Sequence, residues 1–300
     1  MKLLITGSNG LLGQKLAAAL RDRPQHSVIA TSLHPNRVLP LKNSSFEILD
    51  ITQKNDTDSC IAKHRPDVVI HTAAMTLVDA CEQDREACWK INVTGTENIL
   101  RASEKNGAHF IHLSTDFIFD GTDGPYREDA APHPLNYYGT SKLAAEKLVQ
   151  ESQAPWTILR TILVYGVTPQ MARSNIVLFV KNNLEQRKPI RVVEDQFRMP
   201  TLAEDLAWAC LQAAENKTKG IFNISGNDLV SIYQFANLAA EIFGLDKTLI
   251  SPVKTAALQE PAKRPPRTGF VLDKASETLH YRPHSLQEGL RLVRDQFFQN

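Results

Sequence analysis

The sequence predicts an α/β protein with a Rossmann-type, doubly wound parallel sheet and a smaller C-terminal α/β lobe. Two observations favour this fold. An apolar segment at residues 2–6 leads directly into a glycine-rich turn and then a helical pattern. Short apolar segments then alternate with helical segments, which implies right-handed crossovers and a parallel sheet covered on both faces. A chain of 300 residues leaves room for a second lobe.

The expected elements follow in chain order. Strands of the sheet are expected at 2–6, 27–30, 46–48, 68–71, 110–114 and 156–161, with helical segments between them. From about residue 167 the pattern changes to short strands between helices, which are expected at 174–186, 203–216, 231–243 and 285–298. We therefore assign residues 1–166 to the first lobe and 167–300 to the second, with 202–214 as a candidate for packing back on the first.

The composition excludes several classes of protein. Hydrophobic residues make up 42% of the chain and charged residues 22%, which favours a packed core over disorder. Lys and Arg total 34 against 33 acidic residues, so no basic field attracts nucleic acid or anionic lipid. The apolar runs are too short to span a bilayer, and the first residues do not resemble a signal peptide. We expect no nucleic-acid or membrane partner.

The cysteines predict a reducing compartment. Cys60, Cys81, Cys88 and Cys210 show no C-x-x-C spacing, so reduced, mostly buried thiols and a cytoplasmic location are expected. No metal site is expected either, because the histidines are scattered and none is seen at metal-ligand spacing from these thiols.

The glycine-rich turn after the first strand predicts dinucleotide binding. Gly7 permits a tight turn, Gly10 lets the backbone approach a pyrophosphate, and Gly13 lets the helix lie close to the strand. The start of that helix offers unpaired N–H groups and a positive dipole to the anion. The alternative is that these glycines serve turn geometry alone, but their position directly after a buried strand favours the cofactor.

Parallel sheets bind ligands beyond the carboxyl ends of their strands. This rule places the Gly7 turn, Asp50, Ala73-Ala74, Thr115 and Thr161 along one edge of the predicted sheet. Asp50 has an alternative structural role, which is to cap the helix that follows it.

The segment Tyr138-Gly-Thr-Ser-Lys142 places a phenol and an ammonium four residues apart, on one face of a helix. Such a lysine is expected to lower the pKa of the tyrosine, which is about 10 when unperturbed, and so to make it a better acid. The alternative is a surface helix with an exposed lysine and a half-buried tyrosine. Thr115 precedes this pair by 23 positions and is the third candidate catalytic residue.

Together these motifs resemble the extended short-chain dehydrogenase/reductase superfamily. Four segments look more narrowly like the dTDP-4-dehydrorhamnose reductase family: His71 to Asp79, Leu113 to Gly121, Tyr138 to Lys142, and Asp195 to Thr201. The resemblance implies reduction of a 4-keto sugar on a nucleoside diphosphate, with hydride from the nicotinamide and a proton from Tyr138. It also implies that Lys142 holds the nicotinamide ribose, that Thr115 hydrogen-bonds the substrate oxygen, and that Asn92 either positions the lysine through water or acts as a structural cap.

The residues expected at the site fall into two groups. Cofactor contacts are expected from Gly7, Asn9, Gly10, Leu11, Leu12, Gly13, Ser32, Arg37, Asp50, Ile51, Ala73, Ala74, Asn92, Tyr138, Lys142 and Thr161. Substrate contacts are expected from Thr76, Val78, Asp116, Leu163 and Arg198. A homodimer is compatible with the resemblance.

The loop after the second strand predicts NADPH, with NADH as an alternative. An acidic residue there would bind the ribose hydroxyls of NAD and repel the extra phosphate of NADP. The segment from Ala30 to Arg37 holds no acid, and Arg37, with Ser32 and His34, could bind a 2′-phosphate. The alternative is that Arg37 is a solvated loop residue.

Three positions bear on the reaction. Phe117 stands where dehydratases of this superfamily carry a glutamate, which disfavours elimination of water. Leu163 replaces a tryptophan that is usual in the reductases, and Arg198 replaces a glycine, so the identity of the sugar stays open. Arg198 could bind a carboxylate or the diphosphate. A nucleotide-sugar 4-epimerase and a non-catalytic, cofactor-binding regulatory subunit remain alternatives.

Overall fold

A computed structural model describes residues 1–38, 42–170 and 174–298 of the chain. Its centre is a sheet of seven parallel strands in the order β11-β6-β5-β4-β1-β2-β3. The strands are β1 (Lys2–Thr6), β2 (Ser27–Ser32), β3 (Ser44–Ile48), β4 (Val68–His71), β5 (His109–Thr115), β6 (Trp156–Thr161) and β11 (Gly220–Ile224). The strand order reverses between β1 and β4, so the sheet is doubly wound as predicted.

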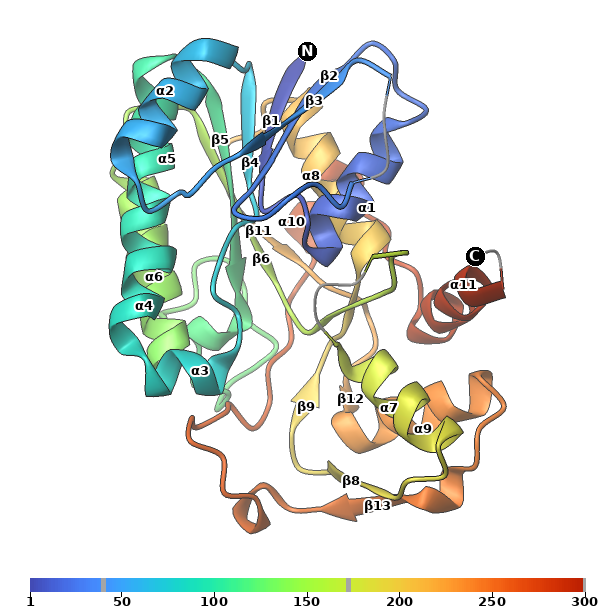
Figure 1. Cartoon of the computed structure of the whole chain (residues 1–300). Coiled ribbons are helices and arrows are strands. Elements are labelled where there is room, and N and C mark those ends of the chain that lie inside the picture. The colour runs from blue at the N-terminus through green and yellow to red at the C-terminus, as the bar shows by residue number, and fades with distance from the viewer. Residues whose placement is uncertain (39–41, 171–173, 299–300) are drawn as a thin grey trace.

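Helices cover both faces of this sheet (Figure 1). One face carries α1 (Leu11–Leu20) and α8 (Ala203–Glu215), and the other carries α2 (Lys54–His64), α5 (Gly95–Lys105) and α6 (Tyr137–Gln150). Alternation along β1 explains the two cores, because successive side chains of a strand point to opposite faces. Leu3 and Ile5 are buried against α1 and α8, whereas Leu4 is buried on the side of α2 and α5.

The second lobe lies beneath the carboxyl ends of the sheet strands (Figure 1). Its helices are α7 (Ile176–Glu185), α9 (Ile232–Ile242) and α11 (Leu286–Phe298), with a buried core that includes Phe235 and Leu290. Two small strand pairs complete it: β8 (Ile190–Val193) lies parallel to β13 (Ile250–Val253), and β9 (Phe197–Arg198) lies antiparallel to β12 (Val230–Ser231).

Shorter elements lie between these strands and helices. These are α3 (Val78–Gln83), α4 (Arg85–Trp89), a π-helical turn (Lys90–Thr94), a 3-10 turn (Asp116–Ile118), β7 (Val164–Tyr165), β10 (Thr201–Leu202) and α10 (Asp273–Leu279). β7 and β10 pair with each other in parallel.

The polypeptide returns to the first lobe after it has left it. Helix α8 packs on α1, where its apolar face includes Leu206 and Cys210, and β11 extends the sheet by pairing with β6. Residues 203–224 thus lie with the first lobe in the structure. The lobe boundary after residue 166 stays a prediction from the sequence. The sequence pattern did not single out β11 as a strand of this sheet, since it is one of several short apolar segments between helices.

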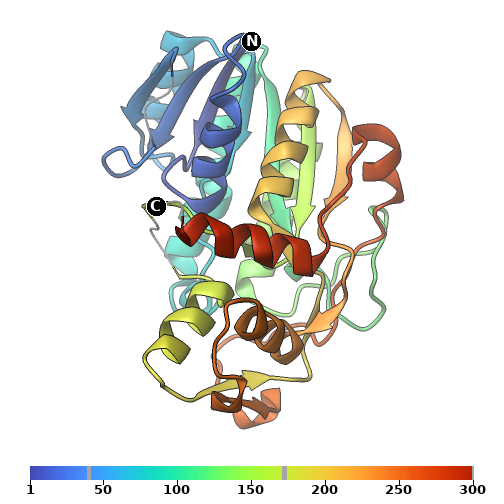
Figure 2. The ribbon, with the colours of Figure 1, turned by 90° about the vertical axis from the view of Figure 1, so that its right-hand side faces the viewer.

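Helix α11 lies across the junction of the two lobes, as Figure 2 shows in dark red. Leu286 and Leu290 pack into the second lobe. Near the other end of the helix, Gln296 accepts a hydrogen bond from Lys15 at 2.8 Å and donates one to Glu204 at 2.7 Å. Among the described residues, no helix is both long enough and apolar enough to cross a membrane.

Candidate active site

The turn between β1 and α1 depends on two of its glycines. Gly7 has a φ of +67°, and a Cβ there would lie 2.8 Å from the backbone of Ala73. A Cβ on Gly13 would lie 2.5 Å from the Cα of Ser8, so glycine at this position lets α1 lie close to the turn. Helix α1 begins at Leu11, directly after the turn, so its first N–H groups can face an anion. The turn therefore fits a pyrophosphate.

Asn9 ties this turn to the loop that follows β2. Its side-chain amide donates to the carbonyl oxygens of His34 and Pro35 at 3.1 and 2.8 Å, and its Oδ1 accepts from the backbone N–H of Arg37 at 2.8 Å. The backbone of Arg37 is thereby held next to the glycine turn. Within the part of the chain that the structure describes, the Arg37 guanidinium forms no ion pair, so it can receive an anion.

Asp50 lies just beyond the end of β3. Its Oδ1 accepts hydrogen bonds from the backbone N–H and the hydroxyl of Thr52, at 2.9 and 2.8 Å. Partial burial raises the pKa of Asp50, but these hydrogen bonds outweigh it and leave the pKa below its usual value. The carboxylate is thus ionised and fixed in a turn ahead of α2. The next residue, Ile51, is buried and would contact a Cβ on Gly95.

Asn92 fixes the loop that follows β4, where Ala73 and Ala74 lie. It exchanges two hydrogen bonds with the backbone of Met75, accepting at 2.8 Å and donating at 3.0 Å. It also lies 3.0 Å from the Ser141 hydroxyl, next to Lys142 on α6. These contacts show Asn92 joining the β4 loop to α6; a water-mediated contact with Lys142 stays a prediction.

A glycine brings Tyr138 to the end of β5. Asn136 caps α6 by accepting from the N–H of Gly139 at 2.8 Å. A Cβ on Gly139 would collide with the carbonyl oxygen of Phe117, so only glycine lets α6 lie against the turn that follows Thr115. As a result Tyr138 lies beside Thr115, and the two residues are only 8% and 5% exposed.

The prediction that Lys142 lowers the pKa of Tyr138 is wrong for this structure. Burial raises the pKa of Tyr138 well above its usual value, and the nearby Thr115 hydroxyl only partly opposes that rise. The tyrosine is therefore fully protonated at neutral pH, which is the form that an acid requires.

Lys142 is buried one helical turn from Tyr138. Its Nζ donates to the carbonyl oxygen of Leu113 at 2.6 Å and lies 3.2 Å from Nε2 of His112. Burial lowers the pKa of Lys142 to about 8, although Glu146 opposes this effect. Glu146 itself is paired with Arg160 at 2.7 Å, so its charge is largely engaged elsewhere.

Asp116 connects Thr115 to the second lobe. Its Oδ1 accepts from the Thr115 hydroxyl at 3.1 Å, and its Oδ2 accepts from the Thr268 hydroxyl at 2.5 Å and lies 3.8 Å from Nε of Arg198. Burial raises the pKa of Asp116, whereas the Arg198 charge opposes that rise. The Arg198 guanidinium also donates to the carbonyl oxygen of Pro265 at 2.7 Å. A contact with a substrate diphosphate would therefore require Arg198 to leave these partners.

The remaining predicted residues lie in different surroundings. Val78 packs against the buried cluster that contains Tyr138, whereas Thr76 is exposed. Leu163 packs in a separate hydrophobic cluster and has a φ of +37°, which is unusual for a residue other than glycine. Thr161 donates to the Thr201 hydroxyl at 3.0 Å.

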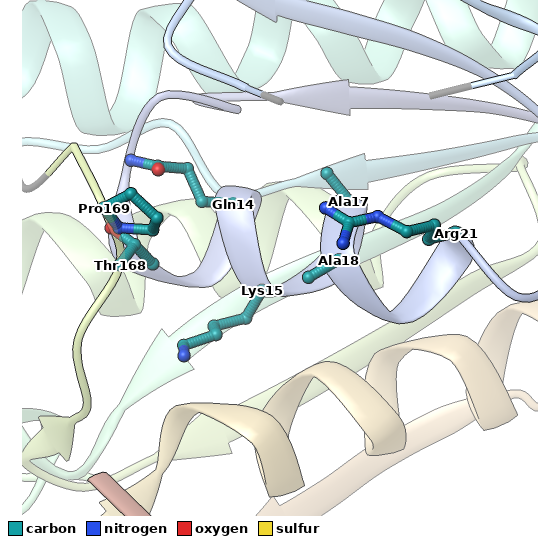
Figure 3. Close-up of a pocket in the computed structure, with 7 residues that line it drawn as sticks. All are labelled: Gln14, Lys15, Ala17, Ala18, Arg21, Thr168 and Pro169. Carbon is teal, nitrogen blue, oxygen red and sulfur yellow. The ribbon is translucent and has the colours of Figure 1, made fainter. Parts of the chain in front are cut away.

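Tyr138 does not line either of two hollows in the described surface. Figure 3 shows the first, which is lined by α1 residues such as Gln14 and Lys15 together with Thr168 and Pro169, and whose cavity measures about 70 Å³. The second lies beside the start of α6, where Glu82, Arg85 and Tyr137 line it.

Three residues that shape the site were not expected from the sequence. Thr268 and His112 contact Asp116 and Lys142 from other parts of the chain, and no local pattern could have indicated them. Asn136 could have been found, because asparagine just before a helical segment is a favoured N-cap.

Residues 1–298 match the family model described as RmlD substrate binding domain. Among curated proteins, the chain is 32% identical to methionine adenosyltransferase 2 subunit beta of Xenopus laevis, with 89% of this chain and 78% of that protein covered. It is 31% identical to dTDP-4-dehydrorhamnose reductase of Aggregatibacter actinomycetemcomitans, with 98% of both chains covered.

Solved structures resemble the chain over its full length. A dTDP-4-dehydrorhamnose reductase from Clostridium acetobutylicum has a TM-score of 0.89 and 30% identity, covering 99% of this chain and 100% of that one. A dTDP-4-dehydrorhamnose reductase from Bacillus anthracis, solved in complex with NADP, has a TM-score of 0.85 and 27% identity, covering 100% and 99%.

Proposed function

Because the chain belongs to the RmlD substrate binding domain family, we propose that it is an NAD(P)H-dependent reductase of a keto group on a nucleotide-linked sugar, similar to dTDP-4-dehydrorhamnose reductase. The observation that carries this proposal is the arrangement around Thr115. Tyr138 lies beside Thr115 at the carboxyl end of β5, and Lys142 lies one helical turn further along α6.

Reduction of a carbonyl group requires a hydride and a proton, and these come from different groups. When bound, NADPH supplies the hydride that reduces the carbonyl carbon. Tyr138 is protonated at neutral pH and can deliver its proton to the carbonyl oxygen as negative charge develops there. Burial removes water from around this hydroxyl, which strengthens its hydrogen bond to the developing charge.

Thr115 must change partner to contact a substrate. Its hydroxyl donates to Asp116 and accepts from the N–H of Phe117 at 3.2 Å. We infer that the hydroxyl turns from Asp116 toward the substrate oxygen when substrate binds. The contacts of Lys142 with the nicotinamide ribose and of Arg37 with a 2′-phosphate are part of the same proposal.

The test is a direct assay of the purified protein. NADPH oxidation is followed with a dTDP-linked 4-keto-6-deoxy sugar and with the corresponding sugar without nucleotide. We expect turnover with the nucleotide-linked substrate and none with Tyr138→Phe. If NADPH binds but no nucleotide-linked keto sugar is reduced, the reductase proposal fails. Interconversion of sugar epimers without net NADPH oxidation would instead indicate a 4-epimerase.

A binding subunit is the second candidate function, because several relatives at about this level of identity are named methionine adenosyltransferase 2 subunit beta. The retention of Thr115, Tyr138 and Lys142 in one buried group favours the reductase. Tight NADPH binding without turnover, together with a stable complex with a methionine adenosyltransferase catalytic subunit, would favour the binding role.

We further propose a cytoplasmic location and self-association. All four cysteines are free and buried, which agrees with a reducing compartment. The side chains of Trp89 and Leu135 are each 40% exposed, which makes this surface a candidate contact between two copies. Sedimentation velocity with Trp89→Lys against the native protein tests the homodimer.

A further inference from the structure

We propose that Glu47, Cys60 and His64 form a binding site for a thiophilic divalent cation such as Zn²⁺, separate from the residues around Tyr138. Among the residues that the structure describes, these three offer a carboxylate oxygen, a sulfur and an imidazole nitrogen that all lie within 4.8 Å of one another. This trio of oxygen, sulfur and nitrogen donors matches the ligands that zinc takes in proteins.

The fold brings the three side chains together from two adjacent elements. Cys60 and His64 both lie on α2, four residues apart, and therefore share one face of that helix. Glu47 comes from β3, the edge strand of the central sheet. The expectation from the sequence that no histidine lies at ligand spacing from a cysteine is wrong for this pair.

The geometry needs little change to hold a metal ion. Nε2 of His64 lies 2.7 Å from Oε2 of Glu47, so the two atoms share a proton. A tetrahedral zinc ion with bonds of about 2.0–2.1 Å to each would separate them to about 3.3 Å. The ion would replace the proton between these two atoms after they separate by less than about 1 Å, and water would fill the fourth position because the protein supplies three ligands.

The surroundings of the site set the conditions for binding. Cys60 is 1% exposed, whereas the side chains of Glu47 and His64 are 29% and 17% exposed, so an ion can enter from the solvent side. A metal ion binds cysteine as the thiolate, so binding converts the thiol and M²⁺ into a metal thiolate and a proton that leaves to solvent.

One cation competes for the same carboxylate. Nζ of Lys63 lies 2.7 Å from Oε2 of Glu47, but the Lys63 side chain is 65% exposed and can turn into water. Lys63→Ala should therefore tighten metal binding, because it removes the competing charge. No such effect is expected if Glu47 and His64 form only an ion pair.

Cobalt titration of the chelator-treated protein tests the proposal. Co²⁺ should bind in a one-to-one ratio and produce a thiolate-to-cobalt charge-transfer band together with the intense visible bands of tetrahedral cobalt, and Zn²⁺ should abolish both. Cys60→Ser should remove the charge-transfer band. His64→Gln and Glu47→Gln, at partly exposed positions, should weaken binding by roughly tenfold or more, whereas Lys63→Ala should strengthen it.

Matched controls make each outcome decisive. Cys210→Ser, at another buried thiol, should keep the band, and Zn²⁺ should raise the melting temperature of the native protein but not of His64→Gln. Circular dichroism checks the fold of each variant. The proposal is overturned if saturating Co²⁺ gives no thiolate band in the native protein. It is equally overturned if the band survives in Cys60→Ser and disappears when Cys81 and Cys88 are replaced.

Discussion

The Asp116 carboxylate lies 3.8 Å from Nε of Arg198, and both side chains are almost completely buried. Asp116 follows Thr115 at the end of β5, whereas Arg198 belongs to β9 of the second lobe, so the pair joins the candidate active site to that lobe. A charge buried in this way is stable only while its partner is present. The main role of Arg198 is therefore to stabilise the buried Asp116 carboxylate, not to bind substrate.

We predict that Arg198→Ala destabilises the protein by about 3–5 kcal/mol, because Asp116 would be left as an unpaired buried charge. The free energy of unfolding is measured by urea titration. Arg191→Ala, at an exposed arginine of β8, the strand that precedes β9 in the chain, should change this free energy by less than about 0.5 kcal/mol. Adding Asp116→Asn should recover part of the loss. If Arg198→Ala is as stable as the native protein, the buried pair does not contribute as the structure indicates.

We predict that Tyr138→Phe lowers turnover by about 10²–10⁴-fold while leaving NADPH affinity nearly unchanged, because only the proton donor is removed. Steady-state kinetics and a fluorescence titration of NADPH measure the two quantities. Tyr137→Phe, at the neighbouring position on α6, serves as the control and should retain activity. Native turnover in Tyr138→Phe would mean that the proton comes from another group.

Lys142 should make stability depend on pH in an alkaline range. Its pKa falls from the ordinary 10.5 to about 8, since burial disfavours the charged form. Below pH 8 both the folded and the unfolded states carry the proton, and folding bears the full cost of burying the charge. Between about pH 8 and 10.5 only the unfolded state keeps the proton, so this group makes stability rise with pH. The gap corresponds to about 3 kcal/mol.

The measurement is the difference in unfolding free energy between the native protein and Lys142→Met from pH 7 to 10.5. Lys142→Met should be the more stable protein at pH 7, and its advantage should shrink as the pH rises. Other groups titrate equally in both proteins and cancel in the difference. A difference that stays constant across this range would show that the lysine titrates at its ordinary pKa.

The sequence predicted most of the sheet but only part of the site. Six of the seven strands follow from apolar segments and the helices between them, because burial on both faces leaves a strong local signal. The glycine turn and the Tyr138/Lys142 pair could also be recognised as motifs in the sequence. The contacts of Lys142 with His112 and of Asp116 with Thr268 could not be predicted, because these partners lie 30 and 152 residues apart and only the fold brings them close. The direction of the Tyr138 pKa shift was wrong for the same reason: burial depends on tertiary packing.

Gly139 is expected to be required for the position of α6. A Cβ at this residue would collide with the carbonyl oxygen of Phe117, so Gly139→Ala should push α6 away from the turn that follows Thr115. We expect a loss of about 1–3 kcal/mol in stability and a larger loss of turnover, since Tyr138 would lose its contact with Thr115. Thr140→Ala, at an exposed position on the same helix, is the control. Full activity in Gly139→Ala would show that α6 can relax without moving Tyr138.

The final prediction is a preference for NADPH over NADH that depends on Arg37. Asn9 holds the backbone of Arg37 beside the glycine turn, where the adenosine ribose of a bound cofactor is expected, and β2 ends in Ser32 without a carboxylate. A charge-assisted contact with the 2′-phosphate is worth about 1.5–3 kcal/mol, or roughly ten- to a hundred-fold in affinity. Arg37→Ala should therefore weaken NADPH by that factor and leave NADH almost unchanged.

Two further variants sharpen this test. Ser32→Asp introduces the carboxylate that binds ribose hydroxyls and repels a 2′-phosphate, so it should shift the preference toward NADH. Arg21→Ala, at an exposed arginine at the end of α1, should change neither affinity. Each cofactor is titrated against the native protein and the three variants under the same salt concentration, because screening weakens the contact between Arg37 and the phosphate. If Arg37→Ala weakens both cofactors equally, Arg37 stabilises the loop and does not bind the 2′-phosphate, and the preference must come from other residues.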